Sequence, residues 1–265
     1  MEANNRNDKW QLGDAYERYM GRWSREVAPR FLHWMEVPAD RRWLDVGCGT
    51  GALCAEIVAR CAPRSVVGID PSEGFLATAR QLLPAEVVLH RASAGQLPLD
   101  DSSVDATVSA LMLNFVPDAG AALREMVRVT ATGGSVGAYV WDYARKMDLI
   151  RLYWDVAAQF DAQARAQDQG ERFPLCQPDA LASAFADAGL RQVEVSAIEI
   201  PMRFADFDDY WRPFLAGQGP APAHAMQLEE PVREQLRERL RERMPVLPDG
   251  SILLQARALT ARGRR

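Results

Sequence analysis

The sequence has few of the residues that bind metals or cross-link chains. It contains three histidines and four cysteines in 265 residues, and no two cysteines form a C-x-x-C pair. This composition does not indicate a zinc site, and we expect no metal. Cys54 and Cys61 would lie about 10 Å apart along one helix, which is too far for a disulfide. We interpret the cysteines as small buried residues of a protein in a reducing compartment.

The sequence also lacks a long apolar run and a basic stripe. No segment approaches the ~20 apolar residues that span a bilayer, and the polar start MEANNRNDKW has no apolar signal region. The net charge is −5, whereas proteins that bind nucleic acid usually carry a basic face. We interpret the basic end (Arg262, Arg264 and Arg265) as a frayed tail. The expected protein is cytoplasmic, a monomer or homodimer, and contacts neither membrane nor nucleic acid.

Short apolar segments alternate with helical patterns along the first half of the chain. Strands are expected at 42–46, 65–70, 86–90, 104–110 and 136–141, with helices after the first, second and fourth of them. Ser72 is the expected N-cap of the second of these helices, and an earlier helix at 14–35 should be kinked or divided by Pro29. Such alternation predicts an α/β fold with a parallel sheet and helices on both faces.

The pattern changes after residue 141. Helices are expected at 146–167 and 179–188, and strands at 191–200 and 252–259, which brings the sheet to seven strands. The insertion between the last two strands has an aromatic segment at 204–215, a Gly/Pro/Ala loop at 218–225 and a charged helix at 230–244. We interpret the whole chain, 1–265, as a single domain.

A glycine-rich turn carries the clearest chemical signal. The segment LDVGCGTG (44–51) runs from a strand into glycines at alternate positions and then into a helix, whose N-terminus offers free N–H groups. Asp70 ends the next strand, where a carboxylate can hydrogen-bond a ribose diol. The G-x-G-x-G spacing differs from the dinucleotide pattern, and Asp45 would repel a pyrophosphate but attract an ammonium. These features favour a nucleoside that carries an amino acid over a dinucleotide.

The segments LDVGCGTG and VVGIDPSEGFLATAR resemble the class I S-adenosylmethionine-dependent methyltransferases, in the branch similar to the ubiquinone/menaquinone (type 11) methyltransferases. The resemblance continues through ASAGQLPLDDSSVDATVSALMLNFVPD and REMVRVTATGGSVGAYVWD. It implies a Rossmann-like fold, S-adenosylmethionine as cofactor, S-adenosylhomocysteine as product and a small-molecule acceptor. It also implies an N-terminal helical lid (10–36), a cofactor-binding half (37–142), a second half of the sheet (143–200), a helical cap (201–249) and a last strand with tail (250–265).

The resemblance also implies roles for individual residues. Asp45 and the glycine loop (Gly47, Cys48, Gly49 and Gly51) should surround the methionine part, and Asp70 should bind the ribose. Pro71 and Ser72 should lie near the adenine, where Ser93-Ala94 replaces the family's usual Asp-Ala pair and leaves a weaker contact. Ala110 and Leu111 should pass the sulfonium. On the lid, Tyr16, Tyr19 and Arg22 are candidates to cover the cofactor, with Arg22 beside the methionine carboxylate.

The acceptor side of the site is less well defined. His224 and Asn114 are weak candidates for catalysis, and a solvent-exposed loop is the other interpretation of His224. The cap aromatics, together with Tyr153 and Trp154, could line an acceptor pocket or simply pack the cap onto the core. Methyl transfer by in-line displacement needs mainly alignment and a dry pocket. The alternatives are a methyltransferase-like protein without catalysis, a nicotinamide-dependent oxidoreductase and an RNA methyltransferase.

Overall fold

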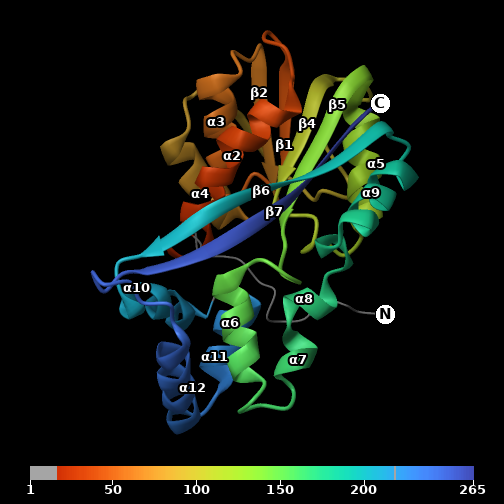
Figure 1. Ribbon diagram of the computed structural model, residues 1–265. Coiled ribbons are helices and arrows are strands. Elements are labelled where there is room, and N and C mark those ends of the chain that lie inside the picture. Colours follow the sequence, from red (N-terminus) through yellow and green to blue (C-terminus); the bar gives the residue numbers. More distant parts are fainter. Residues whose placement is uncertain (1–16, 218) are drawn as a thin grey trace.

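The computed structural model describes residues 17–217 and 219–265 and contains one seven-stranded sheet in the order β3-β2-β1-β4-β5-β7-β6 (Figure 1). Strands β1 to β5 are parallel, whereas β7 pairs antiparallel with both β5 and β6. The prediction of a mostly parallel, seven-stranded α/β sheet is therefore confirmed. The strands are β1 (Arg42–Val46), β2 (Ser65–Asp70), β3 (Val88–Arg91), β4 (Val104–Ala110), β5 (Thr130–Trp141), β6 (Arg191–Phe204) and β7 (Ile252–Arg264).

Helices cover both faces of the sheet. On one face pack α2 (Arg22–Met35), α3 (Ala52–Arg60) and α4 (Glu73–Leu82); on the other pack α5 (Ala119–Val129) and α9 (Pro178–Asp187). Successive side chains of β1 point to opposite faces, so Trp43 enters the first core while Leu44 and Val46 enter the second. Because both faces are covered, most side chains of β1, β2 and β4 are buried, including polar ones such as Asp45 and Thr107.

The helices begin where the sequence offers a capping group. Ser72 accepts a hydrogen bond from the Phe75 N–H at the start of α4, and Asp118 accepts one from the Ala121 N–H at the start of α5. A π-helical segment, η2 (Glu17–Gly21), precedes α2, which continues unbroken through Pro29. The expected division of this helix at Pro29 is therefore wrong.

The second half of the chain differs more from the expected elements. The helix expected at 146–167 is divided into α6 (Asp148–Ala157) and α7 (Ala164–Gln167); α8 (Gln169–Arg172) and η3 (Pro174–Cys176) follow. Between β6 and β7 lie α10 (Phe207–Trp211), η4 (Arg212–Ala216), α11 (Pro220–Gln227) and α12 (Glu230–Arg243), which pack with α6 at the far end of the β6–β7 hairpin (Figure 1). Residues 220–227 are thus a helix where a loop was expected, because Pro220 takes the first helical position that proline favours.

The basic C-terminal segment is a strand, so its interpretation as a frayed tail is wrong. β7 extends to Arg264 and lies between β5 and β6. Arg262 forms ion pairs with Glu194 and Glu36, and Arg264 donates a hydrogen bond to the Ser135 hydroxyl. The charged heads of these side chains are paired, while the backbone of the segment completes the sheet.

Candidate functional site

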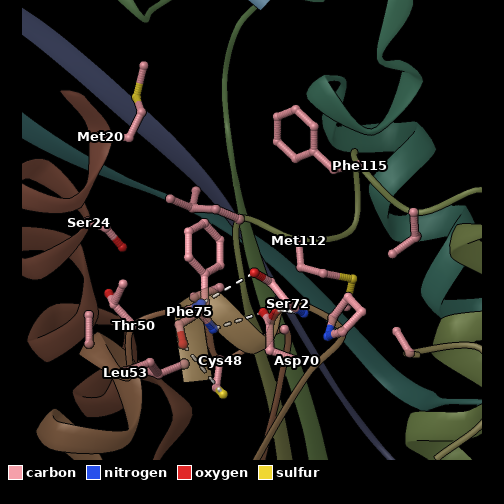
Figure 2. Close-up of a pocket in the computed structure, with 18 of the residues that line it drawn as sticks. Met20, Ser24, Cys48, Thr50, Leu53, Asp70, Ser72, Phe75, Met112 and Phe115 are labelled. Carbon is pink, nitrogen blue, oxygen red and sulfur yellow. Dashed lines mark hydrogen bonds between the residues drawn. The ribbon is translucent and has the colours of Figure 1, made fainter. Parts of the chain in front are cut away.

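A pocket of about 290 Å³ lies where the carboxyl ends of the parallel strands meet (Figure 2). The strand order reverses between β1 and β4, and ligands of open α/β sheets bind at such a switch point. The lining residues follow β1 (Gly47 to Thr50), β2 (Pro71, Ser72), β3 (Ala92 to Ala94) and β4 (Leu111, Met112), or come from η2 (Met20) and α2 (Ser24).

The glycine loop is fixed by the end of the neighbouring strand. The N–H groups of Gly47 and Cys48 both donate to the Ile69 carbonyl, at 2.7 and 3.0 Å. Gly47 has a φ of +74°, and a Cβ at this position would lie 2.5 Å from Cγ of Met112. Glycine is needed here both for the left-handed backbone and for the close approach of Met112, which itself lines the pocket.

Asp70 connects the glycine loop to the start of α4. Its Oδ2 accepts the Gly49 N–H at 3.0 Å, and its Oδ1 accepts the Ser72 N–H at 2.8 Å (Figure 2). Burial raises the pKa of this carboxyl, and the two backbone hydrogen bonds oppose that change. The side chain nevertheless lines the pocket, so its oxygens are placed to accept hydrogen bonds from a ligand as well.

Asp45 lies fully buried beneath the glycine loop. Its Oδ2 accepts a hydrogen bond from the Cys54 thiol at 3.3 Å, while its Oδ1 has no hydrogen-bond partner among the described residues. Burial raises the pKa of Asp45 to about 7; the Cys54 thiol counteracts this and the charge of Asp70 adds to it. A carboxylate with an unsatisfied oxygen at this place suits a ligand that brings a positive charge, such as an amino-acid ammonium.

We expect the stability of the protein to depend on pH through Asp45. Because the folded-state pKa is about 7 and the ordinary value is 3.8, the folded protein favours the protonated carboxyl. Its contribution to stability is complete below about pH 4 and is lost as the pH rises through about 7. Asp45→Asn keeps the shape without the ionisation. The free energy of unfolding of the wild type, measured in urea, should therefore fall relative to that of the variant between these two pH values.

A constant difference between wild type and Asp45→Asn across this range would contradict the prediction. It would mean that the carboxyl ionises near its ordinary pKa despite its burial. Asp118→Asn is a suitable control, because Asp118 is an exposed N-cap of α5 and its carboxyl is open to solvent.

The structure brings most of the sequence-predicted residues together. Two others, Asp45 and Gly51, lie directly behind the lining: Asp45 is buried under the loop, and Gly51 is the N-cap of α3. Leu111 follows β4 with a φ of +61°, a strained conformation for a residue with a side chain, and its N–H donates to the Tyr139 carbonyl. The predicted residues in the lining are Gly47, Cys48, Gly49, Asp70, Pro71, Ser72, Ser93, Ala94, Ala110 and Leu111.

The lid residues lie elsewhere. Arg22 does not line the pocket: its guanidinium pairs with Asp209 at 3.0 Å and lies over the rings of Trp23 and Phe204. Tyr19 is buried with its ring edge against Phe214, also outside the lining. Tyr16 falls outside the described residues. The structure thus places Arg22 outside the pocket lining, with Nη1 paired to Asp209 of α10 and with Nε and Nη2 buried without a hydrogen-bond partner among the described residues.

The two weak catalytic candidates are also outside the pocket. His224 lies in α11 and is 1% exposed, so its interpretation as a solvent-exposed loop residue is wrong. Its Nδ1 lies 2.6 Å from the Tyr153 hydroxyl and its Nε2 lies 3.0 Å from Asp161 Oδ2. Burial lowers the pKa of His224. The amide nitrogen of Asn114 donates to the Cys176 sulfur at 3.5 Å. Both side chains thus serve contacts within the protein.

The aromatic residues of the insertion pack against one another and against the core. The ring of Tyr153 stacks on Phe214, and Phe214 in turn contacts Tyr210 and Trp211. None of these described rings lines the pocket, whose aromatic residues are instead Phe75, Phe115, Trp141 and Tyr143. Of the two interpretations of the insertion aromatics, packing is the one that the geometry supports.

Several pocket residues were missed from the sequence. Trp141 and Tyr143 follow β5, and the rule that strand ends converge could have found them. His90, the last residue of the strand expected at 86–90, is exposed, since β3 runs one residue further and Ala92 lines the pocket instead. No local signal indicates Met20, Ser24 or Phe115, whose positions depend on how α2 and the segment after β4 pack over the sheet.

Across residues 17–217 and 219–265, no group of three or more His, Cys, Asp or Glu side chains is arranged to hold a metal ion. None of the helices in these ranges has the length and apolar character that a bilayer crossing requires.

Comparison with known proteins gives matches to methyltransferases. Residues 44–138 match the model of a methyltransferase domain. A methyltransferase of Mycobacterium tuberculosis that is itself uncharacterized is 41% identical over 128 residues, which cover 48% of this chain and 49% of the relative. The chain thus spans about half the length of that relative. A demethylmenaquinone methyltransferase of Geobacillus kaustophilus is 29% identical over 198 residues, covering 68% of this chain and 82% of the relative.

Solved structures agree on the fold. The phosphoethanolamine N-methyltransferase 2 of Haemonchus contortus, solved in complex with S-adenosyl-L-methionine, superimposes with a TM-score of 0.58 at 14% identity. The superposition covers 95% of this chain and 56% of that one. At such low identity this similarity concerns the fold alone. The matched domain and the methyltransferase relatives support a class I S-adenosylmethionine-dependent methyltransferase of the menaquinone methyltransferase-like branch.

Proposed function

We propose that this protein transfers the methyl group of S-adenosylmethionine to a small-molecule acceptor that binds in the same pocket. One observation carries the proposal: Asp70 and the glycine loop meet at the switch point of the sheet, in a pocket whose remaining walls are largely apolar. This pairing of a diol-binding carboxylate with a closely approachable backbone fits an adenosine that carries an amino acid.

The residues divide the pocket into a donor half and an acceptor half. In the donor half, Asp70 would bind the ribose hydroxyls, and the glycine loop with Asp45 would surround the amino-acid part. The adenine would lie against Pro71, Ser72, Ser93 and Ala94. In the acceptor half, Met20, Phe115, Trp141 and Tyr143 present apolar and aromatic surface. Ala110 and Leu111, at the end of β4, lie between the two.

The donor, once bound, supplies a methyl group on a positively charged sulfur that leaves as a neutral thioether. The chain's own residues contribute alignment and the exclusion of water. Apolar walls that fix the acceptor near the end of β4 convert the reaction into an intramolecular one, which can supply a large share of the rate enhancement. The Ser93 hydroxyl accepts the Gly95 N–H at 3.3 Å and can still donate its own proton to an adenine nitrogen.

A thermal-shift comparison tests the donor half. At about 100 times its dissociation constant, a ligand that binds only the folded state stabilises it by about 2.7 kcal/mol. For a chain of this size, this corresponds to a rise in Tm of several degrees. We expect this rise with S-adenosylmethionine and with S-adenosylhomocysteine, and none with NAD.

A rise with NAD alone would favour a nicotinamide-dependent oxidoreductase and contradict the proposal. Binding of both adenosyl ligands without methyl transfer to any member of a panel of small hydroxyl, amine and thiol acceptors would favour the non-catalytic alternative. A radiolabelled methyl group provides a direct readout of transfer, because the product can be separated from the donor whatever the acceptor atom is.

A further inference from the structure

The amino-acid end of the proposed methyl donor carries a carboxylate as well as an ammonium. A buried carboxylate needs hydrogen-bond donors, because it loses its water on binding. The cation expected for this purpose, Arg22, is held by Asp209 through two contacts, at 3.0 and 3.3 Å, and lies over the rings of Trp23 and Phe204. Arg22 also lies outside the pocket lining, so a donor among the lining residues is better placed to reach the carboxylate.

Ser24 has the position for this role. It lies two residues after Arg22 on α2, is 4% exposed and lines the pocket together with Gly49 and Thr50. Figure 2 shows Ser24 and Thr50 on the same side of the pocket, with Asp70 on the other. If Asp70 marks the ribose, the side with Thr50 and Ser24 is where the amino-acid end of the ligand lies.

The hydroxyl of Ser24 is held in place by a second hydroxyl. Its Oγ lies 2.9 Å from the Tyr139 hydroxyl, and both side chains are buried. Tyr139 belongs to β5, and its ring packs edge-on against Phe31 at 5.0 Å, so the pair joins the lid helix to the sheet. Either oxygen can be the donor. A carboxylate only accepts hydrogen bonds, so Ser24 must donate its proton to a bound carboxylate. The hydrogen bond between the two hydroxyls then has one direction, with Tyr139 as the donor and Ser24 as the acceptor.

We infer that Ser24, oriented by Tyr139, binds the carboxylate of the amino-acid part of the methyl donor. This inference rests on the proposed function, because it assumes that the donor occupies the pocket. Ser24 thereby provides a neutral hydrogen-bond donor in the place where the sequence suggested the charged Arg22. A hydrogen bond to a carboxylate is stronger than one between neutral groups, and the chain from Tyr139 strengthens it further.

Two ligands that differ only at the amino-acid end test the inference. S-adenosylhomocysteine carries the amino-acid carboxylate, whereas 5′-methylthioadenosine has the same adenosine and thioether without it. Titration calorimetry with Ser24→Ala should show about a tenfold loss of affinity for S-adenosylhomocysteine, as expected for a hydrogen bond to a charged group. The affinity for 5′-methylthioadenosine should stay unchanged. Ser24→Thr, which keeps the hydroxyl, should restore most of the loss, and Tyr139→Phe should cause a smaller, equally selective loss.

Ser135→Ala is the matched control. Ser135 is also 4% exposed and its hydroxyl is also hydrogen-bonded, but it lies outside this pocket and accepts from Arg264. Equal weakening of both ligands by Ser24→Ala would overturn the inference, because Ser24 would then shape the pocket as a whole. An unchanged affinity for both would overturn it too. If wild type binds neither ligand, the proposed function fails and this inference fails with it, which the wild-type titration alone reveals.

Discussion

Asp70→Asn should lower the affinity for S-adenosylhomocysteine by about 100-fold or more, given that each hydrogen bond to a charged group contributes about 1.5–3 kcal/mol. The carboxylate accepts the Gly49 and Ser72 N–H groups with separate oxygens. In the variant, one of these oxygens becomes an NH₂ group that faces a backbone N–H, so the loop and the start of α4 are pushed apart. The proposed bonds to the ribose weaken at the same time. Titration calorimetry measures the loss directly.

A matched carboxylate far from the pocket provides the control. Asp105, on β4, is bound by Arg42 through both oxygens, at 2.8 and 3.1 Å, and the pKa of this carboxyl is lowered to about 2, chiefly by that side-chain contact. Asp105→Asn should reduce stability and leave ligand affinity intact. A similar loss of affinity in both variants, or an Asp70→Asn protein that binds normally, would show that Asp70 does not hold the ligand.

Gly47→Ala should destabilise the protein by about 2–5 kcal/mol and abolish ligand binding. Two effects add up at this position: a left-handed backbone costs an alanine about 1–2 kcal/mol, and overpacking costs about 1–3 kcal/mol. The new Cβ would lie 2.5 and 2.6 Å from Cγ and Cβ of Met112. The Met112 Cβ is attached to the backbone and cannot swing away, so the loop itself must move. Thermal unfolding should show a Tm lower by about 4–20 °C, since each kcal/mol lowers the Tm of a chain of this size by about 2–4 °C.

Gly133→Ala separates the two effects. Gly133 has a φ of +78°, close to that of Gly47, but a Cβ there would meet nothing within 4 Å. This variant should show only the backbone cost and should bind S-adenosylhomocysteine normally. Equal destabilisation by the two substitutions would refute the steric argument and leave backbone strain as the sole reason for the glycine at position 47.

Strands and turns that depend on local signals agree best with their expected positions. The segments RWLDV, SVVGID and VDATVSA are strands with the expected limits, 42–46, 65–70 and 104–110. Each is a short apolar run bounded by turn residues. Ser72 caps its helix because a capping serine acts within three residues. Ten of the fifteen residues predicted to contact the cofactor line the pocket, since they belong to these strand ends and turns.

The failures concern contacts between segments that are distant in the sequence. Arg22 is paired with Asp209, which lies 187 residues away, and no local pattern reveals such a partner. His224 stands in a segment rich in Gly, Pro and Ala, a composition typical of loops, yet Asp161 and Tyr153 satisfy both of its ring nitrogens inside the fold. For the same reason Ser24 and Met20 could not be assigned to the pocket before the position of α2 was known.

The position of β7 in the sheet also affects how the protein folds while it is being synthesised. On the ribosome, β7 (Ile252–Arg264) emerges after every other strand, yet it lies between β5 and β6, which emerge earlier. Until then β5 has an unpaired edge next to the Rossmann-like core, and the long β6 has no partner at all. Unpaired strand edges promote association with other chains. We therefore expect nascent chains that stall before residue 252 to be the species most dependent on chaperones.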